Sequence, residues 1–211
     1  MNTKSIREYK QTLRLKQEQR EILVGLLLGD GHLESQNNGR TYRLKVEHGS
    51  KQVSYARWLC DKFQEWLGSG LRKKTRTDGN ISYGFATYSH SAFRFYAHQF
   101  YIDGVKKIPD KIAQLLTPLG LAIWYMDDGS LKSVRHRSYV IHTLGYQRNE
   151  LERAQKAILD LFGIKCKLHR QKDKHWRLYV ISESANRFKE LIAPYVHPSM
   201  KYKLENIKPK K

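Results

Sequence analysis

Two aspartates that each precede a glycine are the residues of this chain best suited to catalysis. Asp30-Gly31 and Asp128-Gly129 close the apolar runs 22–29 and 119–126. Each run predicts a helix that is buried on nearly all sides, because it has no polar face. An aspartate at a helix C-terminus faces the negative end of the dipole and needs a compensating cation. Since paired carboxylates are good ligands for Mg²⁺, the pattern favours a metal site over simple helix termination.

An internal repeat places the two aspartates in similar halves. The segment SHSAFRF (89–95) matches SESANRF (182–188) at five of seven positions. The same order of predicted elements surrounds both segments, which indicates a duplication. Gly68 and Gly163 each stand where a glycine would stop a helix. The extra residues of the first half are assigned to a polar surface loop at 34–40.

The fold class predicted from this order is α+β. Hydrophobic periodicity and turn residues predict one set of elements in each half. In the first half these are a helix at 22–29, a strand at 41–48, a helix at 53–68, strands at 71–77 and 81–88, and a helix at 91–101. In the second half they are a helix at 119–126, a strand at 138–143, a helix at 149–163, strands at 165–170 and 175–182, and a helix at 184–195. The predicted domains are a basic N-terminal extension (1–20), a first half (21–100), a connector (101–117), a second half (118–204) and a basic tail (205–211).

The charge balance indicates a polyanionic partner. Lysine and arginine number 39 against 20 acidic residues, a formal net charge of +19. A compact protein with this charge repels itself unless a polyanion such as nucleic acid is bound. In several predicted strands, basic residues alternate with apolar ones, which gives each half one basic sheet face. The residues expected to contact DNA are Arg43, Lys45, Arg72, Lys74, Arg76, Lys165, Lys167, His169 and Arg177.

Several other classes of protein are disfavoured by composition. No apolar run approaches the ~20 residues of a membrane-spanning helix, and no secretory signal is visible at the N-terminus. Cys60 and Cys166 stand alone in sequence, which predicts neither a disulfide framework nor a zinc site. We therefore expect a protein of the bacterial or phage-infected cytoplasm, or of an organelle matrix, that is not secreted.

The two aspartate motifs resemble a known pair. LVGLLLGDG (23–31) and LAIWYMDDG (121–129) are similar to the two copies of the LAGLIDADG motif. The chain resembles a single-chain, double-motif LAGLIDADG homing endonuclease encoded in group I introns, from about Glu21 to Leu204. One departure is that Gly25 and Gly29 align with Ile123 and Asp127. Close packing of the two motif helices is therefore expected to be asymmetric and to use Gly120 and Ala122.

The resemblance implies a fold and an activity. The expected fold is two pseudo-symmetric αββαββα halves, whose antiparallel sheets form a DNA-binding saddle and whose motif helices lie at the interface. The expected activity is a Mg²⁺-dependent double-strand break in a long asymmetric DNA target, made by a monomer and promoting intron mobility. The sheet faces would read base edges in the major groove, and contacts to phosphates would supply affinity.

The resemblance also implies roles for individual residues. Asp30 and Asp128 are expected to hold the metal, together with the preceding residues Gly29 and Asp127. The Asp127 side chain itself is expected to be structural. The lysine near each scissile phosphate is expected to be Lys203 in the second half and Lys106, or its neighbour Lys107, in the first. Glu47 and His142 correspond to positions that organise water near the metals.

Three alternatives use the same kind of fold. An RNA maturase that assists splicing of a group I intron would bind intron RNA, with or without cleavage activity, and retention of both motif aspartates argues against a purely degenerate form. A DNA-binding regulator without nuclease activity would be expected to carry an added helix-turn-helix domain. An intein origin is disfavoured because the chain begins with Met and lacks splice-junction residues.

Overall fold

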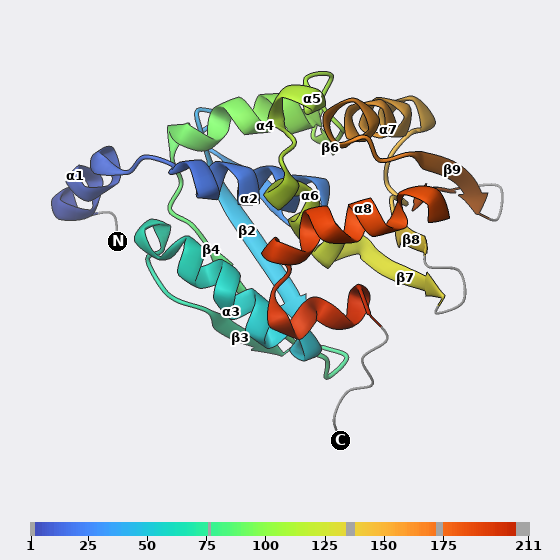
Figure 1. Ribbon diagram of the computed structural model, residues 1–211. Coiled ribbons are helices and arrows are strands. Elements are labelled where there is room, and N and C mark those ends of the chain that lie inside the picture. Colours follow the sequence, from blue (N-terminus) through green and yellow to red (C-terminus); the bar gives the residue numbers. More distant parts are fainter. Residues whose placement is uncertain (1–2, 76, 134–137, 172–174, 206–211) are drawn as a thin grey trace. The chain divides into compact units, whose positions relative to one another are not determined.

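The computed structural model describes residues 3–75, 77–133, 138–171 and 175–205. By their internal contacts these residues form two units, each with its own four-stranded antiparallel sheet (Figure 1). Unit 1 comprises residues 1–20 and 30–97, and unit 2 comprises residues 21–29 and 98–211. Residues 21–29 therefore pack with the second half of the chain, although they precede the first sheet in sequence.

Unit 1 is built on a sheet with the strand order β1-β2-β4-β3. The strands are β1 (His32–Gln36), β2 (Thr41–Gly49), β3 (Arg72–Thr75) and β4 (Ile81–Ala86). Helix α3 (Val53–Lys62) packs on β2 and β4 (Figure 1), and the short turn Ser91–Phe93 leads into α4 (Arg94–Phe100). Helix α1 (Lys4–Thr12) precedes the sheet, and its Tyr9 hydroxyl donates to the Glu65 carbonyl oxygen in the short turn Gln64–Trp66.

The alternation of β2 fixes which side of this sheet is the core. Leu44 and Val46 are buried, whereas Arg43, Lys45 and Glu47 are only half-buried. Successive side chains of a strand point to opposite faces, so the predicted division into an apolar and a basic face is confirmed for β2. A buried cluster of large aromatic side chains completes the core of unit 1: Tyr55, Phe63, Trp66, Phe85 and Phe93.

Unit 2 repeats the sheet with the order β7-β8-β10-β9. Its strands are β7 (Gly129–Ser133), β8 (Ser138–Ile141), β9 (Cys166–Gln171) and β10 (His175–Val180). Helices α7 (Arg148–Phe162) and α8 (Ser182–Ile192) pack on this sheet (Figure 1), and the turns Ala193–Tyr195 and Pro198–Lys203 follow. Between the two halves in sequence lie β5 (Tyr101–Ile102), β6 (Val105–Lys106) and α5 (Ile112–Leu115).

Close helix packing inside unit 2 depends on Gly25. Helix α2 (Gln17–Leu28) meets α6 (Pro118–Asp128) through its residues from Glu21 onward. A Cβ atom built on Gly25 would lie 2.4 Å from the Gly120 carbonyl oxygen and 2.5 Å from Ile123 Cβ. Real Cβ atoms do not come this close, so only glycine allows the two backbones to approach. The expected asymmetric packing is confirmed for Gly120, and the expected part of Ala122 in it stays a prediction.

Some predicted elements differ from the structure. Helix α2 begins at Gln17, earlier than predicted, because the Gln19 amide oxygen accepts from the Lys16 N–H and extends the helix by a capping interaction. Gly68 does not stop α3. That helix ends at Lys62, where Phe63 leaves the helical conformation and packs on Phe85. Gly163 does stop α7, with a left-handed φ of 65°.

The predicted polar loop and connector also contain regular structure. β1 occupies residues 32–36, which were expected to be irregular, because its mixed polar side chains still pair along β2. The connector holds the β5–β6 hairpin, whose turn residues Asp103 and Gly104 both have positive φ. Within the residues that the structure describes, no helix is long and apolar enough to span a bilayer. Of the predicted basic tail at 205–211, residues 206–211 lie outside the described residues.

Candidate active site

The C-terminal end of α2 is closed by two side chains of unit 2. The Tyr146 hydroxyl donates to the Leu28 carbonyl oxygen at 2.8 Å. The Lys106 ammonium donates to the Gly29 carbonyl oxygen at 2.7 Å. Tyr146 is buried, and burial, followed by the nearby Asp128 carboxylate, raises the pKa of its phenol well above the usual range. Tyr146 therefore remains a neutral donor at this helix end.

The C-terminal end of α6 is closed in the same way. Lys203 Nζ donates to the Met126 carbonyl oxygen at 2.5 Å and to the Asp127 carbonyl oxygen at 3.0 Å. The His142 N–H donates to the Asp128 carbonyl oxygen at 3.0 Å. The last carbonyls of a helix have no partner inside the helix, and here the Lys203 side chain and the backbone N–H just after β8 supply partners.

The two lysines stand in equivalent places. Lys106 is held by the β5–β6 hairpin, in which it pairs with Tyr101. Lys203 ends the turn Pro198–Lys203, where its own carbonyl oxygen accepts from the Tyr125 hydroxyl at 2.6 Å. Each ammonium therefore supplies the cation that an aspartate-bearing helix end requires. The choice between Lys106 and Lys107 remains a prediction, although the Lys106 side chain is the one that contacts Gly29.

Asp127 packs directly on the end of α2 within unit 2. Its side chain is 8% exposed, and a Cβ atom built on Gly29 would lie 2.5 Å from Asp127 Oδ2. The absence of a side chain at position 29 is therefore what allows Asp127 to occupy its place. Asp30 follows Gly29 in the chain, while Asp128 is half-buried at the last position of α6.

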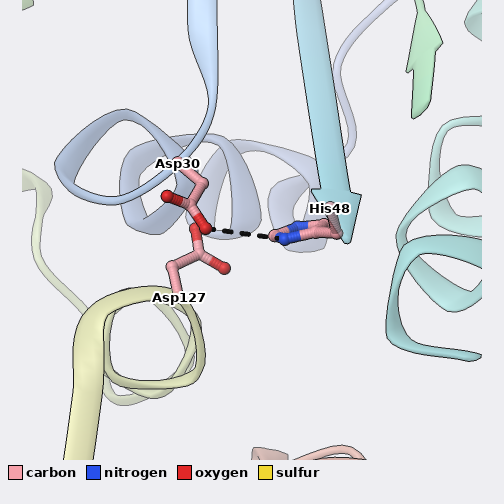
Figure 2. A group of neighbouring side chains, drawn as sticks. All are labelled: Asp30, His48 and Asp127. Carbon is pink, nitrogen blue, oxygen red and sulfur yellow. Dashed lines mark ion pairs between the residues drawn. The ribbon is translucent and has the colours of Figure 1, made fainter. Parts of the chain in front are cut away.

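In unit 1, Asp30 meets a histidine that the sequence analysis did not single out. His48 Nδ1 lies 3.5 Å from Asp30 Oδ2 (Figure 2). The His48 side chain has no exposed surface, whereas the Asp30 side chain is 44% exposed. Because His48 follows Leu44 and Val46 in the alternation of β2, its position on the core face was predictable. Its proximity to Asp30 was not, because that depends on how the chain turns after α2.

Glu47 and His142 each form a hydrogen bond with a serine side chain of the same unit. The Ser82 hydroxyl donates to Glu47 Oε1 at 2.8 Å. In unit 2, His142 Nε2 lies 2.9 Å from Ser130 Oγ. Burial, followed by the charges of Arg177 and Lys203, lowers the pKa of His142. The assignment of these two residues as organisers of water remains a prediction, but both are held in place.

The residues expected to contact DNA differ in how they are paired in the protein alone. Arg43 contacts Glu34, and Lys74 Nζ lies 3.4 Å from Glu47 Oε2. The Arg43 guanidinium lowers the pKa of Glu34, so this pair is ionised at neutral pH. Lys45 and Lys165 are paired as well, with Nζ 4.0 Å from Glu34 Oε1 and 2.8 Å from Glu183 Oε1, respectively. The other described members of the set are Arg72, Lys167, His169 and Arg177. Arg76 lies outside the described residues.

Each unit carries donor atoms of the kinds that ligate a hard divalent cation. In unit 1 these are on Asp30 and His48, and in unit 2 one is on Asp127. Asp128 and the Gly29 carbonyl add further oxygen donors. A set dominated by carboxylate and carbonyl oxygens suits Mg²⁺, Mn²⁺ or Ca²⁺ better than a soft metal.

Comparison with protein families decides the identity of this arrangement. Residues 20–188 match the model of the LAGLIDADG DNA endonuclease family. The chain belongs to that family. The resemblance inferred from the two motifs is thereby confirmed, as are the α+β fold class and the expectation that the protein is a DNA endonuclease.

Relatives of this LAGLIDADG protein include endonucleases and a maturase. It is 31% identical to probable intron-encoded endonuclease 1 of Wickerhamomyces canadensis, over 96% of this chain and 91% of the relative. It is 31% identical to the cytochrome b mRNA maturase bI2 of Debaryomyces hansenii, over 91% of this chain and 75% of the relative. The structure of the homing endonuclease I-WcaI bound to its DNA recognition sequence matches with a TM-score of 0.87 and 28% identity, over 97% of this chain and 93% of that one.

Proposed function

We propose that this LAGLIDADG endonuclease is a site-specific homing endonuclease that makes a Mg²⁺-dependent double-strand break in a long asymmetric DNA target. The observation that carries the proposal is the repeated helix end, at which a lysine ammonium donates to the backbone carbonyl oxygen of the residue just before each motif aspartate, Gly29 before Asp30 and Asp127 before Asp128. One such end would serve one phosphodiester, so two ends suit a duplex. The two ends differ in sequence, which suits a monomer on a non-palindromic site that promotes mobility of its intron.

Each residue has a separate role in this proposal. Asp30 and Asp128 would each supply a carboxylate to bound Mg²⁺, and the Gly29 and Asp127 carbonyls would supply further oxygen donors. When bound, Mg²⁺ supplies the Lewis acid for hydrolysis of the phosphodiester. Lys106 and Lys203 offset negative charge that develops on the phosphate.

Two further residues act on water, and the sheets hold the DNA. Glu47 and His142, oriented by Ser82 and Ser130, order the water that attacks. The basic residues of the sheets contact the DNA backbone and base edges. The closeness of the I-WcaI structure, which was obtained with DNA bound, supports this part of the proposal. We place the protein in a bacterial or phage-infected cytoplasm or in an organelle matrix.

A second candidate function is that of an intron maturase. The similarity to cytochrome b mRNA maturase bI2 favours it, because that relative is as similar in sequence as the endonuclease relative. The partner would then be group I intron RNA. Both motif aspartates are present in this chain, so the endonuclease stays the first proposal and the maturase becomes an outcome of the test.

The test compares cleavage and binding in matched variants. The protein is incubated with Mg²⁺ and a library of duplexes that includes an intron-less host site, and we expect one double-strand cut. Asp30→Asn and Asp128→Asn keep the side-chain shape but remove the charge. Each should abolish cutting while the DNA dissociation constant stays within about threefold of the wild type. Cutting by both variants at the wild-type rate would contradict the site. Tight binding of intron RNA without any DNA cleavage would favour the maturase.

A further inference from the structure

A histidine occupies the core face of β2 where an apolar side chain would be expected. His48 continues the buried series of Leu44 and Val46, and only 3% of its surface is exposed. Burial of an imidazole costs free energy unless its polar atoms are compensated. A side chain that only filled the core would be better replaced by leucine or phenylalanine. The presence of a histidine at this position is therefore best explained by a polar interaction of its ring nitrogen atoms.

The surroundings of His48 fix the direction in which its ring points. The ring packs against the Tyr55 ring, with centroids 5.0 Å apart, and Tyr55 is itself fully buried on α3. With the ring held from that side, Nδ1 faces Asp30 Oδ2 at 3.5 Å. An imidazole can carry a proton on Nδ1 in its neutral or its charged form, so Nδ1 can donate toward the carboxylate. The separation is slightly long for a hydrogen bond, and polar contacts in an active site often shorten when the site is loaded.

From this geometry we infer that His48 is a positioning residue for the metal ligand Asp30. The inference rests on the proposed function, because it concerns the carboxylate to which that proposal gives the cation. His48 Nδ1 contacts one carboxylate oxygen from the core side and so limits rotation of the Asp30 side chain. The role of this contact is to hold the carboxylate in one orientation for the cation.

The exposure of the two side chains favours positioning over direct ligation by His48. A metal ion that acts on DNA must be reached by a phosphate and by water. The Asp30 side chain is 44% exposed and offers that access, whereas the His48 side chain has no exposed surface. Groups that hold a metal ligand in place typically affect metal affinity or activity by 10- to 100-fold when they are removed. We expect an effect of that size for His48.

The experiment uses two substitutions of His48 with different hydrogen-bonding ability. His48→Asn places an amide N–H close to where Nδ1 stands, and His48→Leu fills the same space without a donor. Mn²⁺ binding is followed by loss of the free Mn²⁺ signal in electron paramagnetic resonance, with the protein alone and with its DNA target. We expect His48→Leu to weaken Mn²⁺ binding by about tenfold or more. His48→Asn should recover most of that loss, and the dissociation constant for DNA without metal should be the same in all three proteins.

A matched control separates positioning from loss of core packing. Val46→Ala removes buried atoms from the same face of the same strand, two residues away, and should lower thermal stability without weakening Mn²⁺ binding. Equal Mn²⁺ affinity in the wild type and His48→Leu would overturn the inference. A second contradicting result would be hyperfine coupling of bound Mn²⁺ to a nitrogen nucleus in the paramagnetic resonance spectrum of the wild type that is lost in His48→Leu, because His48 would then be a direct ligand. If the wild type binds no Mn²⁺, whether alone or with its DNA target, and does not cut DNA, the proposed function fails rather than the role of His48.

Discussion

At the scale of single residues, Asp127 and Asp128 are adjacent carboxylates with different surroundings. Asp127 is 8% exposed and lies against Gly29, while Asp128 is half-buried at the end of α6. In the alignment of the two motifs Asp128 corresponds to Asp30, so Asp128 is the predicted metal ligand. The Asp127 side chain therefore has a structural role, packing on Gly29, that does not require it to bind a metal ion.

This difference predicts unequal effects of the same substitution. Asp127→Asn keeps the shape that packs on Gly29, so Mn²⁺ affinity should stay within about threefold of the wild type. Asp128→Asn removes a direct ligand, and Mn²⁺ affinity should fall at least about tenfold, since loss of even an indirect contact can cost that much. The measurement is Mn²⁺ binding at constant pH. If Asp127→Asn loses as much affinity as Asp128→Asn, the second-motif ligand includes the Asp127 side chain.

The sequence could predict the motif residues but not all of their neighbours. Asp30 and Asp128 stand out because charged residues end otherwise apolar helices. Lys106 could be predicted only as a position near a proline, although the Asp103-Gly104 pair is a recognisable hairpin signal that would have placed it on a strand end. The contact of His48 with Asp30 could not be predicted, because it depends on tertiary placement and not on periodicity.

At the scale of elements, the C-terminal ends of α2 and α6 are each expected to be stabilised by a lysine ammonium. Lys106 and Lys203 each donate to terminal carbonyl oxygens of a motif helix. A cation at a helix C-terminus contributes about 0.3–1 kcal/mol, and a hydrogen bond to a charged donor somewhat more. Lys106→Met and Lys203→Met should therefore each lower the free energy of unfolding by about 1 kcal/mol in metal-free buffer.

Neighbouring lysines provide the controls for that measurement. Lys107→Met and Lys201→Met remove the same charge one or two residues away and should change the free energy of unfolding by less than about 0.5 kcal/mol. Urea denaturation of all four variants gives the comparison. Equal losses in the test and control variants would show a general charge effect and would contradict the helix-end role.

The contact between α2 and α6 predicts a steric effect at Gly25. Gly25→Ala would place a methyl group 2.4 Å from the Gly120 carbonyl oxygen, so the backbones must move apart. We expect a loss of about 1–3 kcal/mol in the free energy of unfolding, the usual cost of overpacking. Gly49→Ala is the control, because a Cβ atom there meets nothing within 4 Å. A thermal shift of the same size in both variants would contradict close packing at Gly25.

Secondary structure was predictable where side chains alternate or repeat, and less so where they are mixed. β2, β4, α7 and α8 follow clear periodicity, and their positions were predicted to within a few residues. β1 was missed because HLESQ has no apolar face, and its strand form comes from pairing with β2. The end of α3 was misplaced because Phe63 leaves the helix to pack on Phe85, a tertiary effect that overrides a good helical pattern.

At the scale of the whole molecule, the division into two units crosses the order of the sequence. Residues 21–29 belong by contact to unit 2, although the sheet that follows them belongs to unit 1. Hydrophobicity alone showed only that the first motif helix must be buried. The expectation that it packs on the second motif helix came from the pairing of the two motifs, and the contact of Gly25 with Gly120 agrees with it. The predicted boundary at residue 21, between the N-terminal extension and the first half, thus marks where the sequence repeat begins. Whether it is also a boundary between folded domains stays a prediction.

Three histidines in the two units predict how stability depends on pH. Burial is the main cause that lowers the pKa of His90, His142 and His197 below the ordinary value of 6.5. The unfolded chain therefore binds more protons than the folded protein when the pH falls to about 6.5 and below. Stability that is present above the unfolded pKa is lost on acidification, with a slope of at most about 1.4 kcal/mol per pH unit for each proton.

The free energy of unfolding, measured with urea in metal-free buffer, should accordingly decrease between pH 7.5 and pH 5.5. His90 is the residue to substitute, since its Nδ1 accepts from the Ala92 N–H only when unprotonated. His90→Asn keeps an acceptor for that N–H but cannot take up a proton, so the decrease should become shallower. Glu34 and Glu205 also have lowered pKa values, but they titrate below this window. A free energy that is constant or rises on acidification, or an unchanged slope in His90→Asn, would contradict this account of the three half-buried histidines.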